Sequence, residues 1–131
     1  MSYDAIGISS TGMVLNQTWL NAISDNLSNI NDTASPNSPA FQERFVQATA
    51  NAGTDGVSPG SVVYGSAAGQ LVYDPTNPVA NAQGYVKQPT IDMSTQMTDL
   101  IEAQRAYQAN ANAITSAQSM YQSALQIGAK A

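Results

Sequence analysis

The sequence predicts a mostly α-helical protein in which two long terminal helices flank an irregular middle of loops and short strands. All six prolines and six of the nine glycines lie between residues 33 and 91. Residues 13–35 and 92–127 contain neither residue type. Proline and glycine disrupt helix interiors, and apolar residues recur every seven positions in both terminal segments, so helices are expected there. The three predicted segments are residues 1–32, 33–91 and 92–131.

The first predicted helix covers about residues 4–31. Its stripe follows two series of seven-residue spacing, Ile6, Met13, Leu20, Leu27 and Ser9, Asn16, Ile23, Ile30. The stripe is apolar from about Met13 to Ile30, as in a helix that packs along one side. Gly7 and Gly12 weaken the first turns, so fraying is expected there.

The middle segment predicts short strands joined by turns. Ser61–Tyr64 and Gln70–Tyr73 are β-type runs separated by a glycine-containing stretch, which predicts that they pair as a hairpin. Asp74–Pro78 reads DPTNP, a strong turn signal. Gly84–Lys87 is predicted as a short extended piece, and residues 51–60 are predicted to form a mobile loop.

The second predicted helix is longer and begins after Asp92, a residue type that favours the N-cap. Gly128 is the expected stop. Its two series are Met93, Leu100, Tyr107, Ile114, Tyr121 and Met97, Gln104, Ala111, Gln118, Leu125. Ala, Gln, Met and Leu dominate this segment, and their helix propensity supports the prediction.

Composition excludes several classes of function. The chain has no His and no Cys, which rules out disulfides, imidazole or thiol catalysis and Cys/His zinc sites. Nine acidic against four basic residues leave no basic patch for nucleic acid. No catalytic, cofactor-binding or metal-binding residue is predicted. Asp99 and Glu102 are interpreted as solvated surface charges, and Met93 and Met97 as packing residues.

The N-terminal region is interpreted as neither a leader nor a membrane span. Residues 5–24 carry no charge but contain too many Ser, Thr, Asn and Gln to cross a bilayer, so no direct membrane insertion is expected. The first 30 residues have no Lys or Arg and no apolar leader core. Any export is therefore expected to use a route without a cleaved signal peptide.

The lack of charge favours a subunit that packs against copies or relatives of itself. Charged residues make up 10% of the chain, and residues 106–129 contain none. Solvated helix faces usually carry Glu and Lys, whereas small uncharged faces pack without the cost of charge desolvation. A monomeric two-helix hairpin is the alternative, and Trp19 fits either a partner anchor or packing within its own subunit. The residues expected to pack between helices or subunits are Met13, Leu20, Ile23, Leu27, Ile30, Met93, Met97, Leu100, Tyr107, Ile114, Tyr121 and Leu125.

Two groups of residues resemble the flagellar axial proteins, the family of rod and hook subunits. The first is Asn26-Leu27 followed by Asn29, near the end of the first helix. The second points to the proximal-rod members of that family and comprises Tyr73, Pro75, Asn77, Pro78, Gly84, Tyr85, Val86, Pro89, Asp92, Arg105, Tyr107 and Asn110. The chain departs from the family pattern at Asp25, Ile30, residues 34–41 and Thr90-Ile91.

The resemblance implies a structural subunit of the bacterial flagellar proximal rod, not an enzyme and without cofactors. It implies terminal helices that pair as an antiparallel, D0-like coiled coil and subunits that form a tubular drive shaft around the export channel. The implied partners are copies of itself, other rod proteins, the inner-membrane ring and export-gate base of the rod, and unfolded export substrates in transit. The implied location is the periplasmic part of the basal body, reached by type III export. A leaderless secreted two-helix hairpin, needle-like or effector-like, is the alternative from another class.

Overall fold

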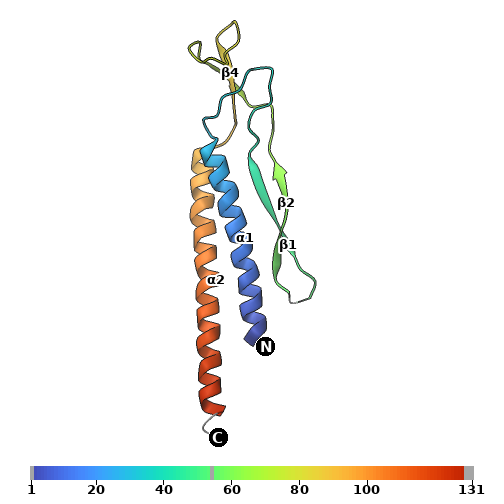
Figure 1. Cartoon of the computed structure of the whole chain (residues 1–131), viewed down its shortest axis with the longest axis vertical. Helices are drawn as coiled ribbons and strands as arrows, with labels where there is room; N and C mark the ends of the chain where they lie inside the picture. Colours follow the sequence, from blue (N-terminus) through green and yellow to red (C-terminus); the bar gives the residue numbers. More distant parts are fainter. Residues whose placement is uncertain (1, 54, 129–131) are drawn as a thin grey trace.

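The computed structural model describes residues 2–53 and 55–128. Two long helices, α1 (Ser2–Ser28) and α2 (Met93–Gly128), lie side by side and run in opposite directions (Figure 1). The chain between them forms four strands, β1 (Arg44–Ala50), β2 (Val57–Tyr64), β3 (Gln70–Tyr73) and β4 (Tyr85–Gln88). This order agrees with the predicted mostly α class. Within the described ranges, neither helix has the length and apolar content needed to cross a membrane.

Side chains close both helix ends that face the middle region. The Asp92 carboxylate accepts hydrogen bonds from the backbone N–H of Thr95 (2.7 Å) and from its hydroxyl (2.9 Å), which confirms the predicted N-cap of α2. At the end of α1, the Asn29 side-chain amide donates to the carbonyl of Asp25 (2.7 Å). The backbone N–H of Asn29 donates to the same carbonyl over 3.2 Å, and α1 ends at Ser28, slightly earlier than predicted.

The predicted hairpin between Ser61–Tyr64 and Gln70–Tyr73 is wrong. The first run belongs to β2, which pairs antiparallel with β1. The second run is β3, which pairs antiparallel with β4. Gly65–Gly69 therefore connects two separate two-stranded sheets and is not a hairpin turn.

Local turns explain the observed pairing. Residues 51–56 join β1 to β2 directly, and the Asn51 N–H donates to the Gly56 carbonyl over 3.0 Å. Gly56 has a φ of +80°, a conformation that glycine adopts at little cost. The predicted mobile loop over residues 51–60 is therefore corrected, because residues 57–60 belong to β2.

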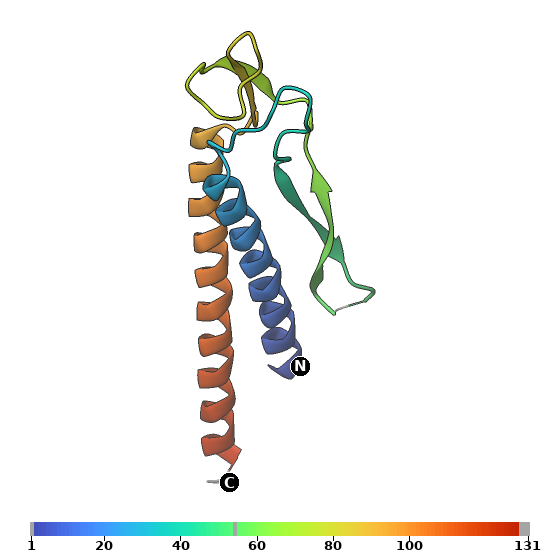
Figure 2. The same cartoon turned by 45° about the horizontal axis from the view of Figure 1, so that its top comes forward.

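α1 lies between α2 and the β1–β2 ribbon (Figures 1 and 2). The β3–β4 sheet lies beyond the helices, at the end where α1 stops and α2 begins (Figure 2). Ala34 and Lys87 exchange two backbone hydrogen bonds of 2.8 Å, so the segment after α1 lies along β4. The small sheet is thereby tied to the end of the helical pair.

The interior of the chain is thin. Among the described residues, the buried side chains are mostly small or polar: Asn16, Ala22, Ile23, Asn26, Ala40, Val86, Pro89, Gln96, Ala103 and Ala117. Large apolar side chains that would fill the core of a self-contained domain are mostly half-buried or exposed. The chain therefore keeps much of its apolar surface available.

Candidate assembly interface

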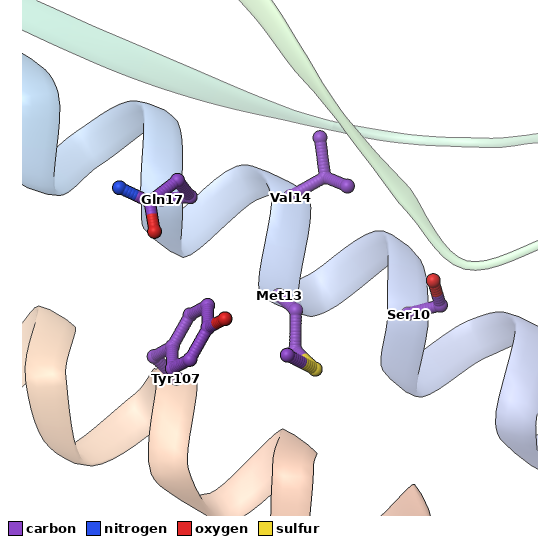
Figure 3. A pocket seen from close by; sticks show the side chains of 5 residues that line it. All are labelled: Ser10, Met13, Val14, Gln17 and Tyr107. Carbon is purple, nitrogen blue, oxygen red and sulfur yellow. The ribbon is translucent and has the colours of Figure 1, made fainter.

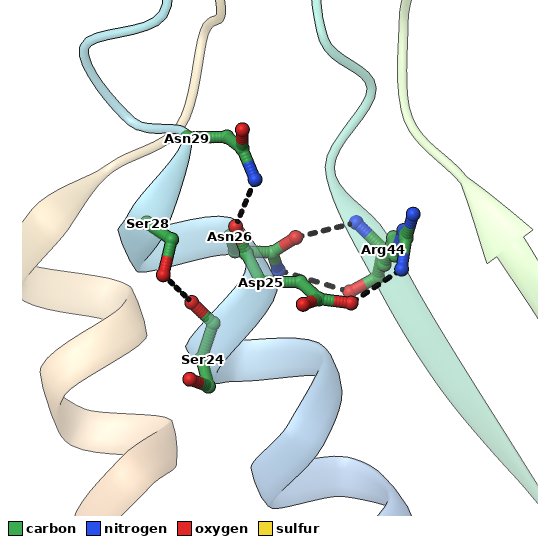
Figure 4. Close-up of polar contacts among 6 residues, drawn as sticks. All are labelled: Ser24, Asp25, Asn26, Ser28, Asn29 and Arg44. Atoms are coloured by element: carbon green, nitrogen blue, oxygen red, sulfur yellow. Dashed lines mark hydrogen bonds and ion pairs between the residues drawn. The ribbon is translucent and has the colours of Figure 1, made fainter.

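The end of α1, the start of β1 and the first turns of α2 meet at the side chain of Asn26, which is 1% exposed. Its carbonyl oxygen accepts the backbone N–H of Arg44 over 2.8 Å, and its amide donates to the backbone carbonyl of Arg44 over 3.0 Å (Figure 4). The same amide donates to the side-chain carbonyl of Gln96 over 3.0 Å. The first Asn of the family motif thus joins three elements with one buried side chain.

Gln96 extends this cluster to the loop before β1. It is 2% exposed, and its amide donates to the Glu43 carboxylate over 2.6 Å. Burial raises the pKa of Glu43, and the nearby carboxylates of Asp99 and Asp92 raise it further, while the hydrogen bond from Gln96 opposes them. The negative charge at Glu43 is therefore disfavoured in the folded chain.

An ion pair between Arg44 and Asp25 covers the outer side of the junction (Figure 4). The Arg44 guanidinium also lies 5.9 Å from the centre of the Phe41 ring. Both charged side chains are about half exposed, so water screens the pair and it adds little to stability. Asp25 is one of the departures from the family pattern, and Arg44 is its partner.

The remaining motif residues at the end of α1 have separate positions. Asn29 caps the helix, as described above, and Leu27 is half-buried. The spacing of the two asparagines puts one on the side of α1 that meets α2 and β1 and the other at the helix end. The Asn26–Asn29 motif therefore joins α1 to α2 and β1 and also caps the end of α1.

The second motif builds the β3–β4 sheet. Tyr73 and Tyr85 lie opposite each other, and their rings meet edge to face with centroids 5.4 Å apart. Gly84 has a φ of +81°, and a Cβ at this position would lie 2.8 Å from the Tyr73 ring. Val86 is fully buried. Glycine is required where the chain returns into β4, because both the backbone angle and the space exclude a side chain.

The turn after β3 is held by its own side chains. The Asp74 carboxylate accepts hydrogen bonds from the hydroxyl of Thr76 (2.9 Å) and the amide of Asn77 (3.2 Å), and these bonds lower the pKa of Asp74. The Asn77 amide also reaches the hydroxyl of Thr33 over 3.4 Å. Of the other motif residues, Pro89 is buried, Tyr107 and Asn110 are half-buried, and Pro75, Pro78, Asp92 and Arg105 are exposed.

The two helices are in close contact at Gly12. A Cβ at Gly12 would lie 2.8 Å from the side-chain amide of Asn110, so α2 uses the space that glycine leaves open. Gly12 was predicted only to weaken the helix, and the structure gives it a packing role as well. The Gly12–Asn110 and Asn26–Gln96 contacts are 14 residues apart on both helices (26 − 12 and 110 − 96). This is two seven-residue repeats.

The large apolar residues predicted to pack are only partly covered within one chain. Ile23 is buried; Met13, Leu20, Leu27, Ile30, Leu100, Tyr107 and Ile114 are half-buried; Met93, Met97, Tyr121 and Leu125 are exposed. That these residues contact other subunits therefore stays a prediction. Trp19 is half-buried and lines a hollow of about 200 Å³ together with Val46 and Ala48 of β1, so it faces its own ribbon.

α2 buries a column of residues that lies outside both of its predicted series. Gln96, Ala103 and Ala117 are buried and Asn110 is half-buried, and these four residues are spaced by seven. The column lies one position before the second predicted series, which begins at Met97. Small and amide side chains at these positions allow close helix approach, and an apolar pattern gives no signal for them. Sequence reasoning also missed Glu43 and Arg44, because they contact residues that are far away in the sequence.

Among the described residues, no group of three or more Asp or Glu side chains is arranged to hold a metal ion, and the chain contains no His or Cys. The features that stand out are a polar junction, a close helix contact and exposed apolar side chains. These are features of an assembling subunit.

Comparison with known proteins supports this interpretation. Residues 82–127 match the family described as "Flagellar basal body rod FlgEFG protein C-terminal". The chain is 32% identical to the flagellar basal-body rod protein FlgC of Escherichia coli O157:H7, over 92% of this chain and 93% of that protein. It is 29% identical to FlgC of Borreliella burgdorferi, over 95% and 96% of the two chains. It is 48% identical to FlgC of Bacillus subtilis over 58 residues, which cover 44% and 39%.

Proposed function

Because the chain belongs to the FlgC family of flagellar basal-body rod proteins, and is thus a structural subunit of the rod, we propose how it assembles. Its terminal helices pair as an antiparallel coiled coil, and copies of the pair pack side by side with related rod subunits. The matched 14-residue spacing of the Gly12–Asn110 and Asn26–Gln96 contacts supports the coiled coil, because a seven-residue repeat keeps the same faces together.

The observation that carries the assembly proposal is the exposed apolar surface of α2. Met93, Met97 and Ile101 are each spaced by four residues, so they share one face of the helix, and all three are exposed. A monomer rarely leaves such a face in water. Neighbouring subunits in the rod would cover it.

We place the chain in the proximal rod, in the periplasm, above the inner-membrane ring, where it transmits torque and encloses the export channel. It reaches this place by type III export without a cleaved signal peptide. Other rod proteins and the export-gate base would be its neighbours.

The assembly proposal is tested with Met97, which is 45% exposed. Met97→Glu should keep the monomer folded but remove the chain from purified basal bodies and abolish swimming, because a buried charge without a partner is costly. Met97→Leu, which keeps an apolar side chain, is the matched control and should assemble. The readout is quantitative mass spectrometry of hook–basal bodies with hook protein as the reference. Normal incorporation of Met97→Glu would contradict this face as a contact.

A further inference from the structure

α1 carries an open hollow on the side that its own chain leaves exposed. The hollow measures about 250 Å³ and is lined by Ser10, Met13, Val14 and Gln17 of α1, with Tyr107 of α2 at its edge (Figure 3). The four α1 residues stand at positions i, i+3, i+4 and i+7. This is the arrangement of four side chains that receives one side chain of a facing helix in knobs-into-holes packing.

The hollow faces outward. Ser10, Val14 and Gln17 are exposed, and further along α1 so are Asn21 and Ser24, which continue the same stripe. α2 and the β1–β2 ribbon lie along the other sides of α1 (Figure 2). A helix that fills the hollow must therefore come from another molecule.

The end of α2 has the properties of such a helix. Because Gly12 faces Asn110, Ser2 at the start of α1 stands level with Met120 of α2, ten residues away in each helix. The following residues of α2 project past α1, as Figure 1 shows. All described residues from Gln118 onward are exposed, and Leu125 is 56% exposed.

We propose that the projecting end of α2 of a second copy of this chain seats Leu125 in the hollow formed by Ser10, Met13, Val14 and Gln17. Neither surface carries a charged side chain, so their contact costs no charge desolvation. The donor and acceptor surfaces differ, so each copy uses its α2 end on one neighbour and its α1 hollow on the next. Such a head-to-tail contact extends into an open helical array and does not close as a dimer. This inference rests on the proposed function and names one contact within it.

Introduced cysteines test the contact, because the natural chain has none. The variant Val14→Cys/Leu125→Cys is expressed in place of the natural chain, and basal bodies are purified and oxidised. Within one chain the two positions are about 25 Å apart along the axis, since Val14 stands level with Gln108 and 17 residues separate Gln108 from Leu125. A disulfide needs Cα atoms within roughly 7 Å, so any bond between these cysteines joins two copies.

The matched control is Ser24→Cys/Leu125→Cys. Ser24 lies on the same exposed stripe, about 15 Å from Val14 along α1. The proposal expects a ladder of dimers and higher multimers for the first pair, about tenfold above the control, because only that pair comes within disulfide reach. Equal yields for the two pairs, dimers alone, or a bond from Val14→Cys to a different protein would each overturn it.

Two further measurements distinguish loss of this contact from a failure of folding or assembly. Ser10→Cys/Leu125→Cys probes the same hollow with a smaller change, and its cross-link is expected as well. Incorporation into basal bodies is measured by mass spectrometry for every variant. Incorporated variants without a cross-link would overturn this contact alone, whereas absence of the natural chain from basal bodies would contradict the proposed function.

Discussion

The side-chain amide of Asn26 donates a hydrogen bond to the side-chain carbonyl of Gln96 over 3.0 Å, and neither side chain is more than 2% exposed. This bond joins residues that are 70 positions apart in the sequence and fixes how far α1 and α2 slide past each other. A buried polar pair stabilises one register of the two helices most, because any sliding of one helix along the other leaves both side-chain amides without a hydrogen-bond partner. Apolar packing alone tolerates such slips more easily.

Replacing Asn26 by Ala should destabilise the isolated chain strongly. Three hydrogen bonds are lost and a buried Gln96 amide group loses a partner, so we expect a decrease of about 3 kcal/mol in the free energy of unfolding. Urea unfolding followed by circular dichroism measures it. Asn31→Ala is the control, since Asn31 is exposed two residues beyond the motif, and it should change stability little. Equal losses for the two variants would show that the junction does not hold the helices.

The Glu43 carboxyl should make the chain less stable near neutral pH than an amide at the same position. Its folded-state pKa is raised, mainly by burial, above the ordinary value of 4.5. The folded chain therefore binds its proton more tightly than the unfolded chain, so the stabilising contribution is present below pH 4.5 and is lost as the pH rises through the folded value. Glu43→Gln keeps an oxygen that can accept the bond from Gln96 and carries no charge.

Glu43→Gln should accordingly be more stable than the natural chain near neutral pH, and the difference should shrink in acid. Urea midpoints for both chains over a pH series measure this difference, and comparing the two chains removes the contribution of every other group. A variant that is less stable at neutral pH would mean that the charge itself holds the junction together.

Sequence reasoning predicted the helices well because their signals are local. Asp92 directly precedes α2, the seven-residue spacing runs along both helices, and neither helix contains Pro. Strand pairing was missed because it depends on distant partners. Residues 44–50 read RFVQATA and gave no prediction of a strand. They nevertheless form β1, which pairs with β2 in place of the expected pairing between β2 and β3. Because β1 was not predicted, Gln70–Tyr73 was the nearest predicted strand with which Ser61–Tyr64 could pair.

The site was predictable only in part for a similar reason. Large apolar residues mark helix faces in a sequence, and several of them, such as Met97, remain exposed in one chain. Gly12 and Asn110, and Asn26 and Gln96, meet at the contact between the helices. A glycine and amide side chains do not form an apolar pattern, so the sequence gives no sign of this contact. Motif resemblance singled out Asn26 and Asn110 without indicating their contacts, which the structure supplies.

Gly84→Ala should destabilise the β3–β4 sheet. The position has a φ of +81°, and a Cβ would meet the Tyr73 ring at 2.8 Å and Pro75 at 3.0 Å. We expect a loss of about 1–2 kcal/mol from the backbone angle alone. Gly7→Ala is the opposite case, because nothing lies within 4 Å of a Cβ there, and it should gain about 0.5–1 kcal/mol from helix propensity. Thermal unfolding of both variants measures the contrast, and a stable Gly84→Ala would exclude this strain.

Replacing Gly12 by Leu should force the helices apart, and shortening Asn110 should relieve part of the strain. The Cβ alone would lie 2.8 Å from the Asn110 amide, and a larger side chain overfills the contact at a cost of about 1–3 kcal/mol. Asn110→Ala removes the amide that blocks this space. The double variant should therefore be more stable than the sum of the two single changes predicts, which a double-mutant cycle of urea unfolding measures. Strict additivity would mean that Gly12 and Asn110 do not meet in solution. Coupling would establish the helix register that also fixes how far α2 projects past α1, on which the contact between copies depends.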